Sequence, residues 1–367
     1  MGRLRDRLDR PQVIQGMKLS TLMKVLARND FRVDPQYLGR LAHLLVLGVF
    51  NSVFARCEAF FNMEEIQAVD IEQAPLFVIG HWRSGTTHLH NLLNVDPRFT
   101  CPTAYQALFP HHFIFSQVGG AVFDLIAPKK RPMDNIAFSS QVPHEDEFAL
   151  VAHCAVSPYM KFLFPVTRDE PYGGLDPQRL PAHALEEWKQ SFILFLKKVT
   201  LSEKGRIVLK SPPHLGRVAT ILELFPDAQF IHIVRNPYTV YRSMWTLWRN
   251  SVAYSCLQKA DRDTVDELIL SWYEELFSLF ERDRGQVPQG ALHEMKFEDL
   301  EERPLDTLRA AYETLQLSGF DEVEGRVVEY LDSIRSYEKN EHHLDDSSRE
   351  KVSIRWRRTF ERYGYSI

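Results

Sequence analysis

The stretch PLFVIGHWRSGTTHLHNLL, residues 75–93, decides the fold class of this chain. A short apolar run ends at Gly80, and a helix-patterned segment follows it, which is the order of a strand, a tight turn and a helix. Gly80 and Gly85 stand five residues apart, as in the phosphate-binding pattern G-x-x-x-x-G-K-[ST]. Thr86, however, occupies the position of the lysine in that pattern, and Arg83 lies inside the loop.

The loop still predicts an anion site. Backbone N–H groups at the start of a helix, together with the helix dipole, bind phosphate-like groups. Ser84, Gly85, Thr86 and Thr87 supply that geometry with added hydroxyl donors, and Arg83 supplies a cation. In nucleotide hydrolases the missing lysine reaches the phosphates and the following hydroxyl holds Mg²⁺, and neither role is filled here in the usual way.

Strand and helix patterns alternate along much of the chain. Apolar runs occur at residues 206–210, 228–234 and 291–297, and helical patterns occur at residues 182–205, 214–225, 237–250, 264–284 and 304–316. Such alternation predicts an α/β fold, in which helices flank both faces of a parallel sheet. We expect a helical N-terminal segment, residues 1–74, packed on a main domain of residues 75–367, with an irregular segment between residues 97 and 180.

Two of the predicted strands end in cations. Lys210 closes RIVLK and Arg235 follows AQFIHIV. Ligands in a parallel sheet lie beyond the carboxyl ends of the strands, so both cations should face the ligand of the loop. A metal-dependent nucleotide enzyme needs an aspartate at such a strand end. The sequence therefore predicts that the protein itself neutralises the bound anion and that no metal takes part.

The ordered motifs RSGTT, LKSPPH and VRNPYTVYRS, followed by KFEDLEERPLDTLRAAYETL, resemble the sulfotransferases that use 3′-phosphoadenosine 5′-phosphosulfate. The resemblance covers residues from about 75 to 316 and implies a P-loop-like nucleotide-binding architecture. It implies that Arg83, Ser84, Gly85, Thr86 and Thr87 hold the 5′-phosphosulfate. It also implies that a strand-end arginine and a serine eight residues later, here Arg235 and Ser243, hold the 3′-phosphate.

The sequence departs from the cytosolic members of that family at three places. Arg83 replaces a lysine, His88 replaces a tryptophan, and residues 336–365 stand where the family has a C-terminal RKGxxGxWK loop. The segment GHWRSGTTHLH, residues 80–90, is more similar to the bacterial and broad branch of the family. Part of the 3′-phosphate site is therefore unassigned.

Two groups compete for the role of catalytic base. His214 follows Lys210 by four residues across a Pro-Pro turn, and a histidine that titrates near neutrality suits the removal of a proton from a hydroxyl. Lys210 could stabilise the charge that develops on the bridging oxygen. Because some members of the family use a glutamate, Glu145 of the cluster Glu145, Asp146 and Glu147 is the alternative base. His111 and His112 are interpreted as loop histidines.

Composition narrows the function classes. The net charge of −5 argues against nucleic-acid binding. Four widely spaced cysteines and a charged N-terminus without an apolar stretch behind it favour the cytoplasm. Residues 41–61 form the nearest approach to a membrane segment, and we interpret them as a core-packed helix, with a helix that lies on a membrane surface as the alternative.

We predict a sulfotransferase that moves a sulfonate group to the hydroxyl of an acceptor that the sequence does not name. The aromatic residues at 105–115 and 159–165 are typical of a protein core and also fit an apolar or lipid-like pocket, so the acceptor can be a carbohydrate, a lipid or another small molecule. The oligomeric state is left open. A phosphotransferase that uses ATP and Mg²⁺, and a nucleotide-binding protein without catalytic activity, are the alternatives.

Overall fold

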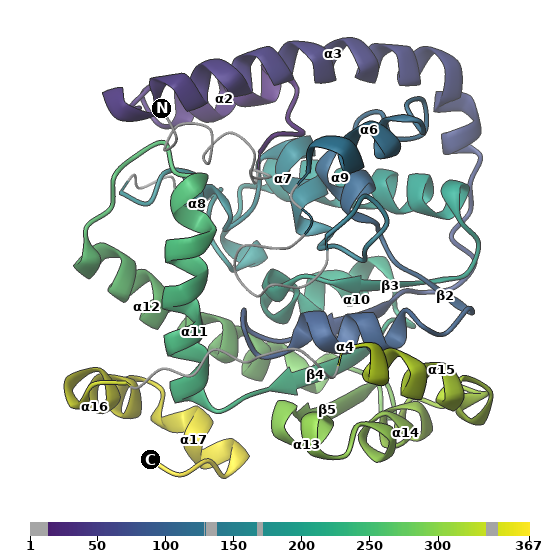
Figure 1. Cartoon of the computed structure of the whole chain (residues 1–367), viewed down its shortest axis with the longest axis vertical. Helices are drawn as coiled ribbons and strands as arrows, with labels where there is room; N and C mark the ends of the chain where they lie inside the picture. Colours follow the sequence, from purple (N-terminus) through teal and green to yellow (C-terminus); the bar gives the residue numbers. More distant parts are fainter. Residues whose placement is uncertain (1–13, 128, 130–137, 167–171, 335–343) are drawn as a thin grey trace. The chain divides into compact units, whose positions relative to one another are not determined.

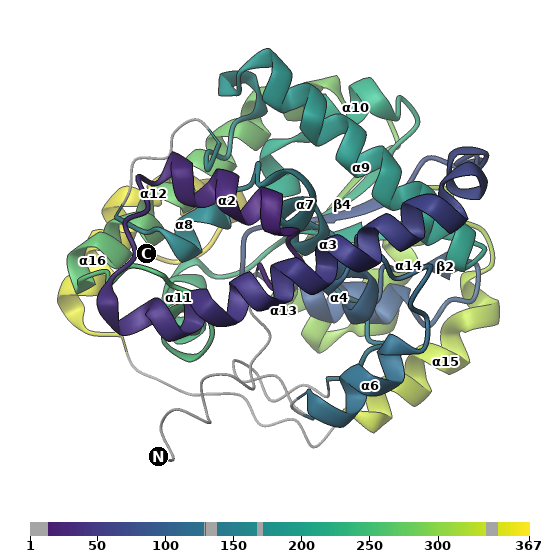
Figure 2. The same cartoon turned by 90° about the horizontal axis from the view of Figure 1, so that it is seen from above.

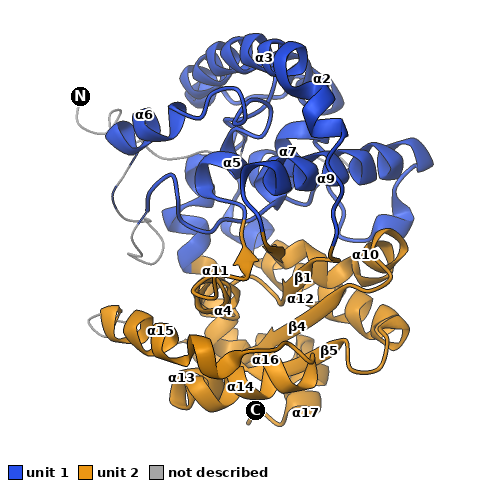
Figure 3. Ribbon diagram, turned by 90° about the vertical axis from the view of Figure 1, so that its right-hand side faces the viewer, with its two compact units in different colours: residues 1–72, 102–204, 246–265 blue, residues 73–101, 205–245, 266–367 orange. Residues whose placement is uncertain are grey.

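The structure is a computed structural model, and it describes residues 14–127, 129, 138–166, 172–334 and 344–367. The chain forms two compact units, and each unit is assembled from segments that are far apart in the sequence (Figure 3). Unit 1 contains residues 1–72, 102–204 and 246–265, and unit 2 contains residues 73–101, 205–245 and 266–367. This division differs from the predicted segments 1–74 and 75–367.

Unit 2 is built on a five-stranded sheet in the order β2-β3-β1-β4-β5 (Figure 1). The strands are β1 (Leu76–Ile79), β2 (Phe99–Thr100), β3 (Arg206–Lys210), β4 (Gln229–Val234) and β5 (Leu292–Lys296). All four strand pairs are parallel. The predicted parallel α/β architecture is therefore confirmed, and β2 is the strand that the sequence patterns did not predict.

Helices cover both faces of this sheet. On one face, apolar side chains of β1, β3 and β4 form a core with α4 (Thr86–Leu93), α14 (Pro304–Thr314) and α15 (Phe320–Ser333). On the other face, α12 (Arg262–Asp283) places Phe280 4.3 Å from the ring of His232 on β4. Because both faces are covered, the central strand β1 consists of apolar residues only, and every one of them is buried.

Unit 2 also contains several shorter helices. They are η3 (Pro212–Gly216), α10 (Val218–Leu224), η5 (Arg284–Gln286), α13 (Phe297–Glu302), α16 (Asp346–Arg355) and α17 (Arg357–Tyr363), and α11 (Pro237–Asn250) begins in this unit. The prediction of one helix over residues 214–225 is wrong, since a 3-10 turn and an α-helix divide that segment at Arg217, which has φ −120°. Pro212 and Pro213 start the 3-10 turn.

Unit 1 is helical in the part that the structure describes. Its elements are α2 (Leu19–Arg28), η1 (Pro35–Tyr37), α3 (Leu38–Gln67), α5 (Ala104–Leu108), α6 (Gly119–Ile126), α7 (Glu147–Cys154), α8 (Met160–Leu163), η2 (Pro177–Arg179), α9 (Ala182–Ser202) and η4 (Val252–Tyr254). The segment predicted to be irregular thus holds short helices. One of them, α5, begins with a capping box between Thr103 and Gln106.

The 30-residue helix α3 packs side by side with α2, as Figure 2 shows from above. It is long and apolar enough to cross a membrane by length and composition, but only 22% of its most apolar window is buried. The interpretation of residues 41–61 as a core-packed helix is therefore wrong, because a large part of the apolar surface of this helix faces outward.

Candidate active site

The loop between β1 and α4 has a backbone that only certain residues tolerate. Arg83 has φ +70° and Gly85 has φ +101°, both in the left-handed region. A Cβ atom at Gly85 would overlap the ring of Phe297, and one at Gly80 would overlap the carbonyl oxygen of Ile233 on β4. Both glycines are thus required by close packing, and the turn delivers the start of α4 to the carboxyl ends of the strands.

Buried polar groups hold the loop in this shape. The hydroxyl of Ser84 donates to the carbonyl oxygen of His81 at 2.8 Å. The Nδ1 atom of His81 contacts the carbonyl oxygen of Trp82 at 2.8 Å, and burial lowers the pKa of His81 to about 4. The imidazole is therefore neutral near pH 7. His81 and Trp82 also pack in ring contacts with Tyr273 and Trp272 of α12.

Three of the predicted cofactor residues meet beside this loop. Arg83 donates from Nε to the hydroxyl of Ser243 on α11 at 2.8 Å, and Arg235 donates from Nη1 to the carbonyl oxygen of Arg83 at 3.4 Å. Burial lowers the pKa of Arg235, and Glu298 opposes that shift. Since an arginine stays charged in proteins, the site presents two guanidinium groups and a helix N-terminus to one region.

Lys210 and His214 lie at the end of β3, which pairs with β1. Lys210 is in register with Val78, two residues before Gly80, and its side chain is 2% exposed. His214 is fully buried on η3, and its ring meets the edge of Phe77 at 5.4 Å. The structure thus places the predicted lysine and histidine at the same edge of the sheet as the loop.

Glu145 lies in unit 1. It precedes α7, and its carboxylate accepts a hydrogen bond from the hydroxyl of Tyr159. Asp146 and Glu147 are fully buried at the start of the same helix. Lys210 and His214 both belong to unit 2, and Glu145 belongs to unit 1. Whether His214 or Glu145 is the base stays a prediction.

Phe297 and Asn236 belong to the site but were not predicted from the sequence. The ring of Phe297 packs against Gly85, and the guanidinium of Arg235 lies over it at 4.1 Å. The side chain of Asn236 accepts from the backbone N–H of Tyr238 at 3.0 Å and so caps α11. The Asn-Pro pair that starts this helix is a recognisable N-cap signal, and Phe297 follows the last strand directly.

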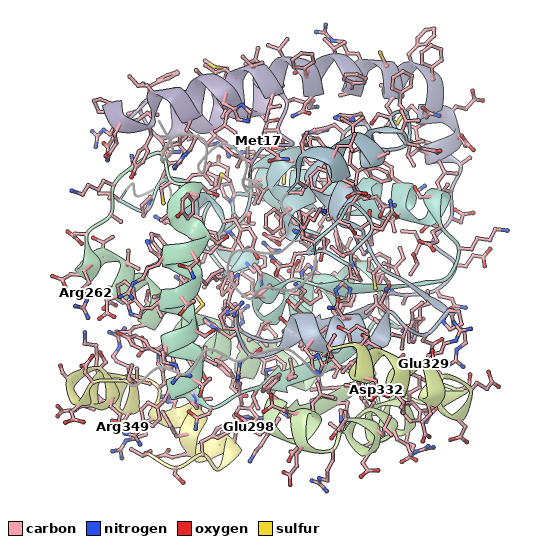
Figure 4. The ribbon with its side chains drawn as sticks, viewed as in Figure 1. Met17, Arg262, Glu298, Glu329, Asp332 and Arg349 are labelled. Atoms are coloured by element: carbon pink, nitrogen blue, oxygen red, sulfur yellow. The ribbon has the colours of Figure 1, made fainter. Side chains whose placement is uncertain are left out.

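Glu298 ties the C-terminal segment to this corner of unit 2 (Figure 4). Its carboxylate accepts from the backbone N–H of Asn236 and from the hydroxyl of Tyr365, both at 2.9 Å. Arg349 of α16 lies over the ring of Tyr238 at 4.2 Å. The C-terminal helices α16 and α17 therefore pack beside α11, which carries Ser243.

A metal site is not apparent in the described residues. They contain no group of three or more His, Cys, Asp or Glu side chains arranged to hold a metal ion. His111 and His112 are buried in unit 1, where their ring nitrogens contact the carbonyl oxygen of Ala152 and the hydroxyl of Ser116. That the reaction proceeds without a metal stays a prediction.

Gly85→Ala should destabilise the protein by about 2 kcal/mol, because a side chain at positive φ is strained and this one also meets Phe297. The measurement is urea unfolding followed by circular dichroism. Gly285→Ala is the matched control, because a Cβ atom at Gly285 meets nothing within 4 Å. Equal stability of the two variants would show that the loop does not need this conformation.

Comparisons with known proteins agree with this geometry. The model of the sulfotransferase family matches residues 75–322. The chain is 34% identical over 354 residues to the omega-hydroxy-beta-dihydromenaquinone-9 sulfotransferase Stf3 of Mycobacterium bovis and to that of Mycobacterium tuberculosis. Each alignment covers 95% of this chain and 90% of the relative.

Two solved structures share the fold. Sulfotransferase STF1 from Mycobacterium tuberculosis superposes with a TM-score of 0.66 at 18% identity and covers 92% of this chain and 91% of its own. Sulfotransferase STF9 from Mycobacterium avium superposes with a TM-score of 0.64 at 16% identity. The superposition covers 96% of this chain and 98% of the STF9 chain. The likeness therefore extends over both units and not only over the loop.

Proposed function

The chain belongs to the sulfotransferase family, and on that premise we propose that it moves a sulfonate group from 3′-phosphoadenosine 5′-phosphosulfate to the hydroxyl of a lipid-like acceptor. The observation that supports this donor is the cluster of Arg83, Ser243 and Arg235 beside the N-terminus of α4. These groups supply charge and hydrogen-bond donors without using a carboxylate or a metal.

The contact between Arg83 and Ser243 supports a donor with two phosphate positions on one ribose. The resemblance to the family implies that Arg83 binds the 5′ end of the donor and Ser243 the 3′-phosphate, and the Nε atom of Arg83 lies 2.8 Å from the hydroxyl oxygen of Ser243. Because the 3′ and 5′ positions belong to the same sugar ring, neighbouring cations can serve both groups. Ser243 lies on α11, whose start Asn236 caps, and Arg83 lies in the loop that leads directly into α4.

The chemistry at the end of β3 follows from the residues there. In the transfer, the bond between sulfur and the oxygen of the 5′-phosphate breaks, and a bond between sulfur and the acceptor oxygen forms. His214 takes the proton of the acceptor hydroxyl, and the nucleotide leaves as a 3′,5′-bisphosphate. Lys210 stabilises the negative charge that develops on the leaving oxygen. Positioning and charge stabilisation thus account for the reaction.

A lipid-like acceptor is supported by the relatives and by unit 1. The name of the relatives specifies a hydroxylated dihydromenaquinone as acceptor, and they match this chain over most of its length. In unit 1 a row of aromatic rings, each within 6.2 Å of the next, ends at Tyr159, whose hydroxyl contacts Glu145. The row consists of Phe109, Phe123, Phe138, His144, Phe148 and Tyr159.

Sulfonate transfer from labelled donor to a panel of alcohols tests the acceptor class. The panel contains prenyl alcohols of increasing chain length in detergent micelles, a short water-soluble prenyl alcohol, a sugar and a phenol. We expect kcat/KM to rise with chain length, because apolar area that is removed from water strengthens binding. A kcat/KM for the sugar that equals or exceeds that for the longest prenyl alcohol would contradict the acceptor but not the donor.

Arg235→Ala should weaken binding of adenosine 3′,5′-bisphosphate by about 10- to 100-fold, since a hydrogen bond to a charged group contributes about 1.5–3 kcal/mol. Ser243→Ala should also weaken binding of adenosine 3′,5′-bisphosphate, but by a smaller factor. Titration calorimetry with adenosine 5′-phosphate, which lacks the 3′-phosphate, is the matched control and should show little loss. Equal losses for both nucleotides would place these residues at the other end of the donor.

A further inference from the structure

The helix α3 has its polarity reversed relative to a surface helix of a soluble protein, because it buries its polar side chains. Asn51 is 2% exposed and donates to the carbonyl oxygens of Gln15 and Met17, and its distance to the Met17 oxygen is 2.9 Å. Figure 4 labels Met17 beneath the helix. Glu58 is 3% exposed and pairs with Lys198. Arg40 is buried too, and it donates to the carbonyl oxygen of Cys256. All these partners belong to unit 1.

The outward side of α3 is apolar over most of its length. Eight large apolar side chains are more than a third exposed, and Phe60 reaches 82%. They are Leu38, Val46, Val49, Phe50, Val53, Phe54, Phe60 and Phe61. A surface helix of a soluble protein shows the opposite arrangement, with apolar residues inside and charged residues outside. The outer side of α3 is therefore suited to an apolar environment.

Neighbouring residues of unit 1 extend this surface. Phe115 stacks on Phe61 at 5.7 Å and lies 6.2 Å from Phe54. Shortly after it, α6 and the residue before it expose four more side chains by 58% to 85%, namely Val118, Val122, Leu125 and Ile126. We call these thirteen residues the apolar face. In the part of the chain that the structure describes, they account for 13 of the 19 exposed large hydrophobic residues.

We propose that the apolar face docks on the surface of a lipid bilayer that contains anionic headgroups. Patches of this extent on a soluble protein mark interaction sites. Arg56 is the only exposed charged residue between Leu38 and Phe61, and Lys129, which follows α6, is exposed as well. Cations beside an apolar helix face match the headgroup region of an anionic bilayer.

The helix lies on the bilayer and does not cross it. A crossing would expose Arg40, Asn51 and Glu58 to hydrocarbon, and ionisable groups there are costly. In the structure these three side chains are instead bonded to other parts of unit 1. The polar side of α3 thus stays on the protein while the apolar side reaches the acyl chains.

The apolar face also continues into the aromatic row that ends at Tyr159. Phe54 lies 5.3 Å from the ring of His112, which lies 5.7 Å from Phe109, the first member of that row. If the acceptor is a membrane lipid, which rests on the proposed function, the bilayer is where it is found. This continuity favours a bilayer over a second copy of the chain as the occupant of the face.

Sedimentation of the purified full-length protein with sucrose-loaded vesicles tests the proposal without donor or acceptor, so its failure is distinct from a failure of the proposed function. The vesicles contain phosphatidylcholine, alone or with phosphatidylglycerol at about three to one. We expect tighter binding to the anionic vesicles. The double variant Phe60→Asp, Leu125→Asp should bind them at least about tenfold more weakly, and Arg56→Glu should lower only the preference for anionic lipid.

The double variant Ile354→Asp, Ile367→Asp is the matched control, because both residues are exposed apolar residues of unit 2 and it should bind vesicles as the native protein does. Circular dichroism checks the fold, and Phe60→Ser, at a side chain that is 82% exposed, replaces the double variant if that one unfolds. Equal vesicle binding by the two double variants would overturn the proposal. A dimer that ignores vesicles and dissociates on Phe60→Ser would assign the face to a second copy instead.

Discussion

His214→Asn should lower kcat by about 10²–10⁴-fold, which is the usual contribution of a general base. His214 lies on η3 directly after β3, fully buried and four residues beyond Lys210, at the sheet edge where the phosphate loop begins. Asparagine keeps the size and polarity of the side chain but does not accept a proton. The affinity for the donor nucleotide should change by less than about threefold, because the imidazole acts on the acceptor hydroxyl.

Glu145→Gln decides between the two candidate bases. If His214 is the base, this variant should keep most of the native kcat, and the loss should appear only in His214→Asn. If Glu145→Gln abolishes turnover while His214→Asn retains it, the carboxylate beside Tyr159 is the base and our assignment is wrong. Single-turnover kinetics at saturating donor separates the chemical step from product release.

Lys210→Met should lower kcat by about 10²–10³-fold, the size seen when one preorganised group that stabilises developing charge is removed. Lys210 is 2% exposed at the end of β3, where its charge is poorly screened by water. The loss should be larger in kcat than in donor affinity, since charge on the leaving oxygen develops in the transition state.

Lys296→Met is the matched control for that experiment. Lys296 also ends a strand of the same sheet, β5, but its ammonium lies 5.0 Å from the centre of the Tyr365 ring. We expect it to change kcat by less than about threefold. Equal losses in Lys210→Met and Lys296→Met would mean that strand-end lysines serve the stability of the sheet rather than the reaction.

Four of the five strands could be predicted. β1, β3 and β4 are largely buried and appear as short, mostly apolar runs, whereas β5 is only partly buried. β2 could not, since it has two residues, Phe99 and Thr100, and two residues show no pattern. The predicted helix over residues 237–250 has the observed bounds of α11, because Pro237 and the preceding Asn236 form a strong start signal.

The candidate site could be predicted in its parts but not in its contacts. Arg83 was identified from the loop pattern, and Arg235 and Ser243 from the resemblance to the sulfotransferase family. Nothing in the sequence shows that Arg83 and Ser243, 160 residues apart, are hydrogen-bonded. Phe297 was not predicted as a site residue, because an aromatic residue after a strand has many ordinary roles. Its role depends on the missing side chain at Gly85, which only the packing reveals.

The orientation of α3 was the least predictable feature. The sequence shows an apolar stretch with a few polar residues, and such a stretch normally turns its polar side to water. Here Arg40, Asn51 and Glu58 face inward because their partners Cys256, Met17 and Lys198 come from three distant segments of unit 1. Pairing across such distances cannot be read from a local pattern.

The most direct test of the central claim is mass spectrometry of both products after incubation with 3′-phosphoadenosine 5′-phosphosulfate and a long-chain prenyl alcohol. We predict that the alcohol gains one SO₃ group and that an equal amount of adenosine 3′,5′-bisphosphate appears. High mass accuracy distinguishes this product from a phosphorylated one. A phosphorylated alcohol formed from ATP and Mg²⁺, with no sulfonated alcohol from the phosphosulfate nucleotide, would contradict the account.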